Sequence, residues 1–329
     1  MTDIESNGSQ LPTVLLAGAT GYIGKHVCET LLDRGFHVLS LGRGNFKTVD
    51  HRNFEHISID ICSDKEMTEF ARSGRQIDAL ISCLGSRTGG RRDAWAVEFG
   101  ANKNLLNLSL LMSSKKFVLL SAICVQRPRL EFQFAKIAFE DHLIASGITY
   151  SIVRPTAYFK SLAGQIENLK AGKAFVVFGK GVGTACKPIS AKDLSDYICG
   201  CLEDPKRQNK VLPIGGPGPS ITPIEQGEML FRLLDKKPNF CYLPSIMFRI
   251  ISALIAPLSL ISEKISNLRE FIHIGHYYAT ESMLFWDETN ERYSSKETPE
   301  YGCDTLENFY CEVLKSGMEG QELGDHKLF

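Results

Sequence analysis

A strand, a glycine-rich loop and a helix follow one another near the N-terminus, and this succession constrains the fold more than any other feature. Residues 13–17 (TVLLA) form a short apolar run typical of a buried strand. The loop Gly18-Ala-Thr-Gly21-Tyr-Ile-Gly24 comes next, and residues 25–35 (KHVCETLLDRG) then have helical spacing. Three glycines so placed allow a tight turn, a close approach to a pyrophosphate and close helix–strand packing. The pattern predicts a dinucleotide site; the alternative is a loop with a structural role only.

Further apolar runs alternate with segments of helix length. We predict strands over 36–41, 57–59, 79–83, 117–121 and 150–153, and one more over 210–214. This alternation predicts an α/β fold, a Rossmann-type doubly wound parallel sheet with a smaller, mostly helical C-terminal substrate lobe. Thr222 and Glu225 form a capping-box pattern that opens a helix over 223–237.

The alternation fades after Pro155, which suggests a division of the chain. We expect a flexible N-terminus over 1–11, an NADP-binding Rossmann domain over 12–220 with substrate-lobe insertions after 155, and a substrate-binding lobe over 221–329.

Charge and cysteine spacing argue against several classes of protein. The 37 Lys and Arg nearly balance the 38 Asp and Glu, so a nucleic-acid partner is not expected. The ten cysteines form no CxxC pair and the eight histidines have no metal-ligand spacing, so no protein-bound metal is expected. The polar, acid-containing start resembles neither a secretory signal nor a transit peptide, which favours a cytoplasmic location with reduced thiols.

The end of the second strand indicates which dinucleotide is bound. An acid there would hold the ribose of NAD, whereas this chain has Gly42-Arg43, which suits the 2′-phosphate of NADPH. Alternatively, Arg43 is a solvated loop charge. Asp60 follows the third strand and is placed to accept a hydrogen bond from the adenine, or else to cap a turn. We expect the cofactor to contact Gly18, Thr20, Gly21, Tyr22, Ile23, Gly24, Arg43, Asp60, Cys83, Leu84, Gly85, Ser121, Lys136 and Pro155.

The segment after the fifth strand resembles the short-chain dehydrogenase/reductase superfamily in its extended or atypical branch. Ser121 is at the position of the superfamily's serine, and Lys136 ends a Tyr-x-x-x-Lys frame whose tyrosine position is Phe132. The resemblance implies that Lys136 holds the nicotinamide ribose; its alternative is a surface pair with Glu140. Phenylalanine cannot deliver a proton, so the departure favours hydride addition to a conjugated C=C bond, or a non-catalytic cofactor binder.

Longer segments resemble a more specific family, the NADPH-dependent 3,8-divinyl (proto)chlorophyllide a 8-vinyl reductases. They are 83–90, 117–140, 150–167, 185–190 and 212–234. The resemblance implies reduction of the 8-vinyl group of a magnesium tetrapyrrole, divinyl chlorophyllide or protochlorophyllide, to ethyl during chlorophyll or bacteriochlorophyll synthesis. Two alternatives remain: another atypical ene or carbonyl reductase, or a non-catalytic NADPH-binding sensor or assembly subunit.

A proton donor and a substrate slot follow as hypotheses. Tyr158, three residues after Pro155, is the first candidate acid, Lys136 the second and a water the third. Arg87, Arg91 and Arg92 are candidates to pair with the pigment's propionate, or form a solvated basic loop. Candidates for the apolar slot, with core packing as the alternative for each, are Phe159, Phe175, Phe178 and residues 246–261.

Residues 246–261 also raise a membrane question. The sixteen residues are interrupted by Arg249 and Pro257, and a span needs about 20 apolar residues. We expect a buried or lid-forming helix pair; the alternative is an interfacial segment that touches the photosynthetic membrane surface.

Overall fold

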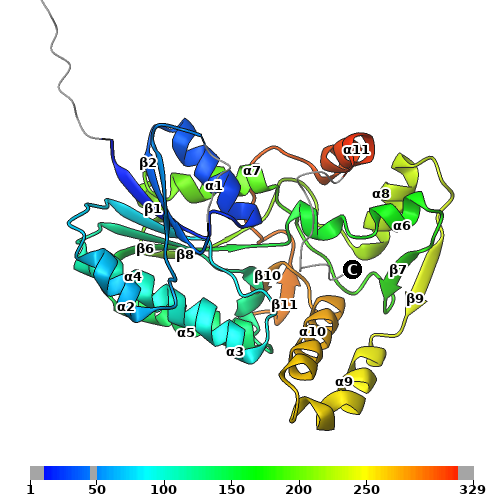
Figure 1. Ribbon diagram of the computed structural model, residues 1–329. Helices are drawn as coiled ribbons and strands as arrows, with labels where there is room; N and C mark the ends of the chain where they lie inside the picture. Colours follow the sequence, from blue (N-terminus) through cyan, green and yellow to red (C-terminus); the bar gives the residue numbers. More distant parts are fainter. Residues whose placement is uncertain (1–10, 45–49, 318–329) are drawn as a thin grey trace, which may run out of the picture.

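The computed structural model describes residues 11–44 and 50–317 (Figure 1). Seven strands form one parallel sheet in the order β3-β2-β1-β4-β5-β6-β8. The predicted Rossmann-type sheet is therefore confirmed, and the strand predicted over 57–59 is longer than expected and begins at Phe54. The flexible segment expected over 1–11 lies outside the described residues except for Leu11. The strands are β1 (Thr13–Ala17), β2 (His37–Gly42), β3 (Phe54–Ser58), β4 (Ala79–Ser82), β5 (Lys116–Leu120), β6 (Thr149–Pro155) and β8 (Lys210–Ile214).

Alternating residues of the strands face two helical layers. Val14 and Leu16 pack with α1 and α7, whereas Leu15 and Ala17 pack on the opposite face with α2, α4 and α5. Both faces of the sheet are covered, which explains why its strands are continuously apolar. The helices of these layers are α1 (Tyr22–Asp33), α2 (Asp64–Ala71), α3 (Arg91–Ala94), α4 (Asn102–Leu111), α5 (Glu131–Ala145) and α7 (Ala191–Gly200); a π-helical segment, Trp95–Ala101, joins α3 to α4.

The strand order reverses between β1 and β4, which are neighbours in the sheet. In open α/β sheets, ligands bind in the crevice at the carboxyl ends of the strands where the order reverses. This topology therefore positions the glycine loop after β1 beside the loop after β4.

A second core joins two distant parts of the sequence. Phe159 and Phe175 pack with Phe231 and Tyr310, and Figure 1 shows the elements that carry this core together on the right of the molecule. The capping box predicted at Thr222 and Glu225 is confirmed at the start of α8. The elements of this core are a 3₁₀ turn (Phe159–Leu162), α6 (Ile166–Lys170), β7 (Phe175–Phe178), α8 (Pro223–Leu233), β9 (Phe240–Leu243) and α11 (Leu306–Ser316). Outside it lie α9 (Ile246–Ser259), α10 (Glu263–Thr280), β10 (Phe285–Asp287), β11 (Arg292–Ser294) and two further 3₁₀ turns, Ile123–Gln126 and Pro205–Arg207.

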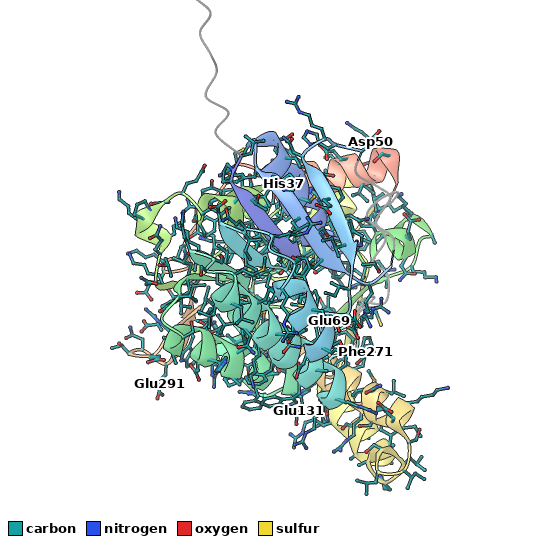
Figure 2. The ribbon with its side chains drawn as sticks, turned by 60° about the vertical axis from the view of Figure 1, so that its left-hand side comes forward. His37, Asp50, Glu69, Glu131, Phe271 and Glu291 are labelled. Carbon is teal, nitrogen blue, oxygen red and sulfur yellow. The ribbon has the colours of Figure 1, made fainter. Side chains whose placement is uncertain are left out.

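Helices α9 and α10 form a hairpin that projects from the body of the molecule (Figures 1 and 2). Residues 246–261 contain one helix, α9, rather than the expected pair, since α10 begins only at Glu263. The expected burial is also wrong, because Ser252 is the one buried residue of α9. Leu254, Leu260 and Ile261 are 72%, 85% and 82% exposed. Within the described part of the chain, no helix is both long and apolar enough to cross a bilayer.

Candidate active site

The loop between β1 and α1 needs glycine at two positions. Gly18 has φ +85°, and a Cβ there would lie 2.6 Å from the carbonyl oxygen of Cys83 at the end of β4. A Cβ on Gly24 would lie 2.0 Å from the carbonyl oxygen of Gly18. The loop is therefore pressed between β4 and its own helix, the arrangement expected of a pyrophosphate-binding turn.

The N-terminus of α1 is arranged to receive an anion. Gly21 is the N-cap and provides no side-chain hydrogen bond, and the first turn, which begins with Tyr22 and Ile23, contains no acid. The backbone N–H groups and the helix dipole therefore remain available for a phosphate. This geometry fits the pyrophosphate of a dinucleotide. The pyrophosphate would lie beside residues predicted to contact the cofactor, including Thr20.

The two residues predicted for the adenosine half have different surroundings. Arg43 is exposed at the end of β2. Asp60 accepts a hydrogen bond from the backbone N–H of Cys62 at 3.1 Å, so it does cap a turn, and its own N–H donates to Glu66 at 2.9 Å.

The predicted residues Cys83, Leu84, Gly85, Ser121 and Pro155 follow or end β4, β5 and β6. The parallel pairing of these strands brings their carboxyl ends to one edge of the sheet, beside the glycine loop. Burial raises the pKa of the Cys83 thiol to about 12, so it stays protonated at neutral pH and behaves as a small apolar residue.

A buried acid missed in the sequence holds Lys136. The ammonium of Lys136 lies 2.7 Å from Glu98, whose side chain is only 3% exposed. The carboxylate of Glu98 also accepts the backbone N–H of Ser86 at 2.8 Å and its hydroxyl at 2.9 Å. The alternative pairing of Lys136 with Glu140 is therefore wrong.

Glu98 reaches this position through the π-helical segment Trp95–Ala101. Such segments are rare and occur often at functional sites. The side chain of Asn102 donates to the carbonyl of Glu98 at 2.9 Å and so supports the wider turn. No motif in the sequence predicts a π-helix, which is why spacing arguments overlooked this acid.

Ser121 participates in a different network. Its hydroxyl donates to Glu140, and Arg154 of β6 donates to both oxygens of the same carboxylate. Ser121 and Glu140 are buried, with the Glu140 side chain only 2% exposed, and Arg154 is 22% exposed. The serine hydroxyl is thereby engaged in an ion-pair network between β5, α5 and β6.

Tyr158 lies among the groups of the predicted site. Its ring is 6.4 Å from that of Tyr22, and the ammonium of Lys160 lies 4.5 Å from the Tyr22 ring. Burial raises the pKa of Tyr158 above its usual range, and Cys83, Cys124, Glu98 and Tyr22 are near enough to add to the effect. Its hydroxyl forms no hydrogen bond with any residue of 11–44 or 50–317.

A second phenol reaches the same region from α10. Burial raises the pKa of Tyr278 well above its usual value, with Cys124 and Tyr158 contributing. Phe132, at the usual tyrosine position, packs in the cluster that contains Cys124 and Ile274. Because α10 lies over 100 residues from the other site residues in sequence, no local pattern could place Tyr278 there.

The residues predicted for the substrate do not form one group. Arg91 and Arg92 are 79% and 87% exposed and line an open cavity of about 740 Å³ with Trp95 and the tip of the hairpin. Arg87 is exposed in the preceding loop. Phe159 is buried in the second core together with Phe175, and Phe178 packs against Phe248 of α9 with ring centroids 4.8 Å apart.

One cluster has side chains typical of a metal site. Asp193, Cys303 and Asp304 place ligand-type atoms within 4.8 Å of one another. The Asp193 carboxylate, however, accepts the backbone N–H groups of Cys303 and Asp304, and Asp304 accepts the hydroxyl of Ser190. These bonds explain the cluster as a cap that joins α7 to the segment before α11.

Comparisons with known proteins agree with this geometry. A protein-family model for NAD(P)H-binding domains matches residues 18–205, more than half of the chain. Solved structures include an NADPH-dependent quinone oxidoreductase of Escherichia coli, complexed with NADPH, with a TM-score of 0.67 and 16% identity over 92% of this chain and 99% of that one. This likeness supports the fold.

Curated relatives extend the match over nearly the whole chain. The chloroplastic divinyl chlorophyllide a 8-vinyl-reductase of Cucumis sativus is 45% identical over 332 residues, covering 96% of this chain and 79% of the relative. The Arabidopsis thaliana protein of the same name is 43% identical over 329 residues, covering 95% and 79%. The family expected from the quoted segments is confirmed, and the chain belongs to the divinyl chlorophyllide a 8-vinyl-reductase family, with an NAD(P)H-binding domain of Rossmann type.

Proposed function

We propose that this protein uses NADPH to reduce the 8-vinyl group of divinyl chlorophyllide or protochlorophyllide a to ethyl. The observation that carries the proposal is identity of 43–45% with four vinyl reductases over at least 95% of the chain. The glycine loop and the anion-receptive start of α1 supply a dinucleotide site, and Arg43 favours the 2′-phosphate of NADPH over NAD.

The reaction adds a hydride and a proton across one C=C bond. NADPH, when bound, supplies the hydride, which adds to the terminal vinyl carbon. The negative charge then spreads into the macrocycle that is conjugated with the vinyl group, so no acid is needed to stabilise an oxyanion. This accounts for Phe132 at the position where carbonyl reductases of the superfamily have tyrosine.

Lys136 orients the nicotinamide ribose in this proposal. An ammonium has three N–H donors, and Glu98 takes one of them at 2.7 Å. The remaining two are available for the ribose hydroxyls. Glu98 also holds Ser86 of the loop after β4, so the lysine and that loop are fixed by the same carboxylate.

Tyr158 is the proposed proton donor to the inner vinyl carbon. Its raised pKa keeps the phenol protonated at neutral pH, and its hydroxyl has no described partner that would compete for the proton. Tyr158→Phe should lower kcat by about 10²–10⁴-fold and leave the Kd for NADPH unchanged. Full turnover by this variant would transfer the role to Lys136, Tyr278 or a water.

Conversion of the pigment tests the function directly. Purified protein, NADPH and divinyl chlorophyllide a should yield the 8-ethyl product, seen as a shift of the Soret absorbance and confirmed by chromatography and mass. Replacing NADPH with NADH should slow the reaction. A protein that binds NADPH and leaves the pigment unchanged would be a sensor or assembly subunit. A protein that reduces quinones or phenylpropanoids instead would be another ene or carbonyl reductase.

We further propose that α9 contacts the surface of the photosynthetic membrane, from which an apolar pigment is delivered. Ile246, Ile250, Leu254 and Leu258 recur every four residues on α9 and are 49–72% exposed. An exposed apolar stripe on a helix too short to span is typical of interfacial binding. Cosedimentation with vesicles of photosynthetic lipids should decrease for Leu254→Asp, and equal binding by both proteins would refute the contact.

A further inference from the structure

A second, smaller cavity lies between α9 and α10 and is strongly basic. It has a volume of about 320 Å³, and neither Asp nor Glu is among the described residues that line it. Its cationic and titratable lining residues are Arg129, Arg249, Arg269, His273 and His276. The positive charges of the three arginines repel one another, and an anion in the cavity would relieve this repulsion.

The neighbouring carboxylates neutralise only part of this charge. Glu281 lies 2.7 Å from Arg129, but it also pairs with Arg127 at 3.3 Å. Glu270 lies 3.7 Å from His273 on the same helix. Arg249, on α9, forms no ion pair with any residue of 11–44 or 50–317.

A buried hydroxyl fixes the geometry of the cavity floor. Ser252 is 4% exposed, and its Oγ lies 2.6 Å from Nε2 of His273. The same oxygen accepts a hydrogen bond from Nε of Arg269 at 3.2 Å. With Nε engaged in this way, the terminal nitrogens of Arg269 remain to bind a planar anion in the two-pronged manner that guanidinium groups favour.

His276 is affected by the surrounding charges. Burial lowers its pKa, and Arg249, His273 and Arg129 lower it further, opposed by Glu281. The imidazole is therefore neutral at neutral pH and able to act as a hydrogen-bond partner, while the arginines supply the positive charge.

One tyrosine separates this cavity from the proposed active site. Tyr277 lines the cavity, and its hydroxyl donates to the backbone carbonyl of Cys124 at 2.9 Å. The ring centroid of the adjacent Tyr278 is 5.7 Å from that of Tyr277, and Tyr278 is close enough to Tyr158 for Tyr158 to contribute to its raised pKa. Phe248, which packs on Phe178, also lines the cavity.

We infer that the basic cavity between α9 and α10 binds the propionate carboxylate of the pigment, with Arg249 and Arg269 as its ligands. The inference rests on the proposed function and specifies how the substrate is oriented. The propionate and the 8-vinyl group lie on opposite sides of the macrocycle. An anchored carboxylate therefore directs the 8-vinyl group, rather than the 3-vinyl group, toward the nicotinamide, and orientation of this kind is a large part of catalysis.

The test compares divinyl chlorophyllide with its methyl ester, which has the same ring and no negative charge. A charge-assisted hydrogen bond contributes about 1.5–3 kcal/mol, so Arg249→Gln should raise the KM for the free acid about 10–100-fold. Its KM for the ester should stay near the wild-type value, and its kcat for the acid should fall toward the kcat of the wild-type protein for the ester, because the carboxylate no longer orients the ring. Arg249 is exposed, so the variant is expected to fold, and an unchanged Kd for NADPH would verify this. Lys264→Gln, an exposed cation of α10 outside the cavity, is the matched control and should change neither KM.

Binding without turnover separates this inference from the proposed function. Quenching of pigment fluorescence by the protein in the absence of NADPH gives the Kd for acid and ester, even if no pigment is reduced. Equal effects of Arg249→Gln and Arg269→Gln on acid and ester would overturn the carboxylate site. The site would also be overturned if the preference for the acid were lost in an Arg91/Arg92 double variant but kept in Arg249→Gln and Arg269→Gln. It would likewise be overturned if these two variants lost binding to anionic vesicles and kept the preference for the acid.

Discussion

The ion pair between Glu98 and Lys136 allows a quantitative test of the site. Its side chains are 3% and 12% exposed, and removing one partner of such a pair leaves a buried charge without compensation. That loss costs about 3–5 kcal/mol, and the residual exposure of Lys136 favours the lower end. We therefore expect Glu98→Gln to lower the free energy of unfolding by about 3 kcal/mol.

The reverse substitution should cost less. In Lys136→Met, the Glu98 carboxylate still accepts two hydrogen bonds from Ser86, each worth about 0.5–1.5 kcal/mol, so we expect a loss of about 2 kcal/mol. The double variant contains neither charge and should lose about 3 kcal/mol, not the sum of 5. The expected coupling energy is therefore about 2 kcal/mol, within the range seen for residues in contact.

Urea unfolding followed by circular dichroism measures all four proteins. The matched control is the exposed pair of Arg75 and Glu55, 2.6 Å apart and 41% and 40% exposed, whose coupling should stay below about 1 kcal/mol. Coupling between Glu98 and Lys136 no larger than in this control would refute the buried ion pair. Titration with NADPH should show weaker binding for both single variants, because each loses the orientation of the lysine ammonium.

Three further outcomes follow from the geometry. Gly24→Ala places a Cβ 2.0 Å from the Gly18 carbonyl oxygen, and such overpacking costs about 1–3 kcal/mol. The Kd for NADPH, measured by calorimetry, should therefore rise about tenfold or more. An unchanged Kd would mean that the loop does not hold the pyrophosphate. Arg43→Ala should raise the KM for NADPH about 10–100-fold and leave that for NADH unaltered, since only NADPH has the 2′-phosphate; parallel changes would count against this role. A phenol is protonated below its pKa, and burial raises the pKa of Tyr158, so kcat should stay level up to at least about pH 10. A fall in kcat near neutral pH would exclude Tyr158 as the acid.

The parallel sheet was predictable because its determinants are local. Each strand is a short apolar run, the glycine loop is contiguous, and the Thr222–Glu225 capping box spans four residues. Strand ends shifted by a few residues, as at β3, because pairing with β2 rather than local composition decides where a strand begins. The family could also be identified from contiguous segments.

The partners of the charged side chains were not predictable in the same way. Lys136 has an acid four residues away, Glu140, and helical spacing alone would pair them. In the folded protein Glu140 pairs with Arg154 of β6 instead, and Glu98, which lies in a π-helical segment, pairs with Lys136. The choice depends on which side of α5 faces the sheet, and that is decided by packing.

The sequence by itself determined the alternation of strands and helices up to Pro155, the dinucleotide loop and the family, because each depends on residues adjacent in the chain. Only the tertiary structure decided that α9 presents its apolar side outward and that Tyr278 and the basic cavity approach the site. The physical reason is that burial and charge pairing depend on distances in space. Residues more than 100 positions apart become neighbours only after the sheet and the α9–α10 hairpin have packed.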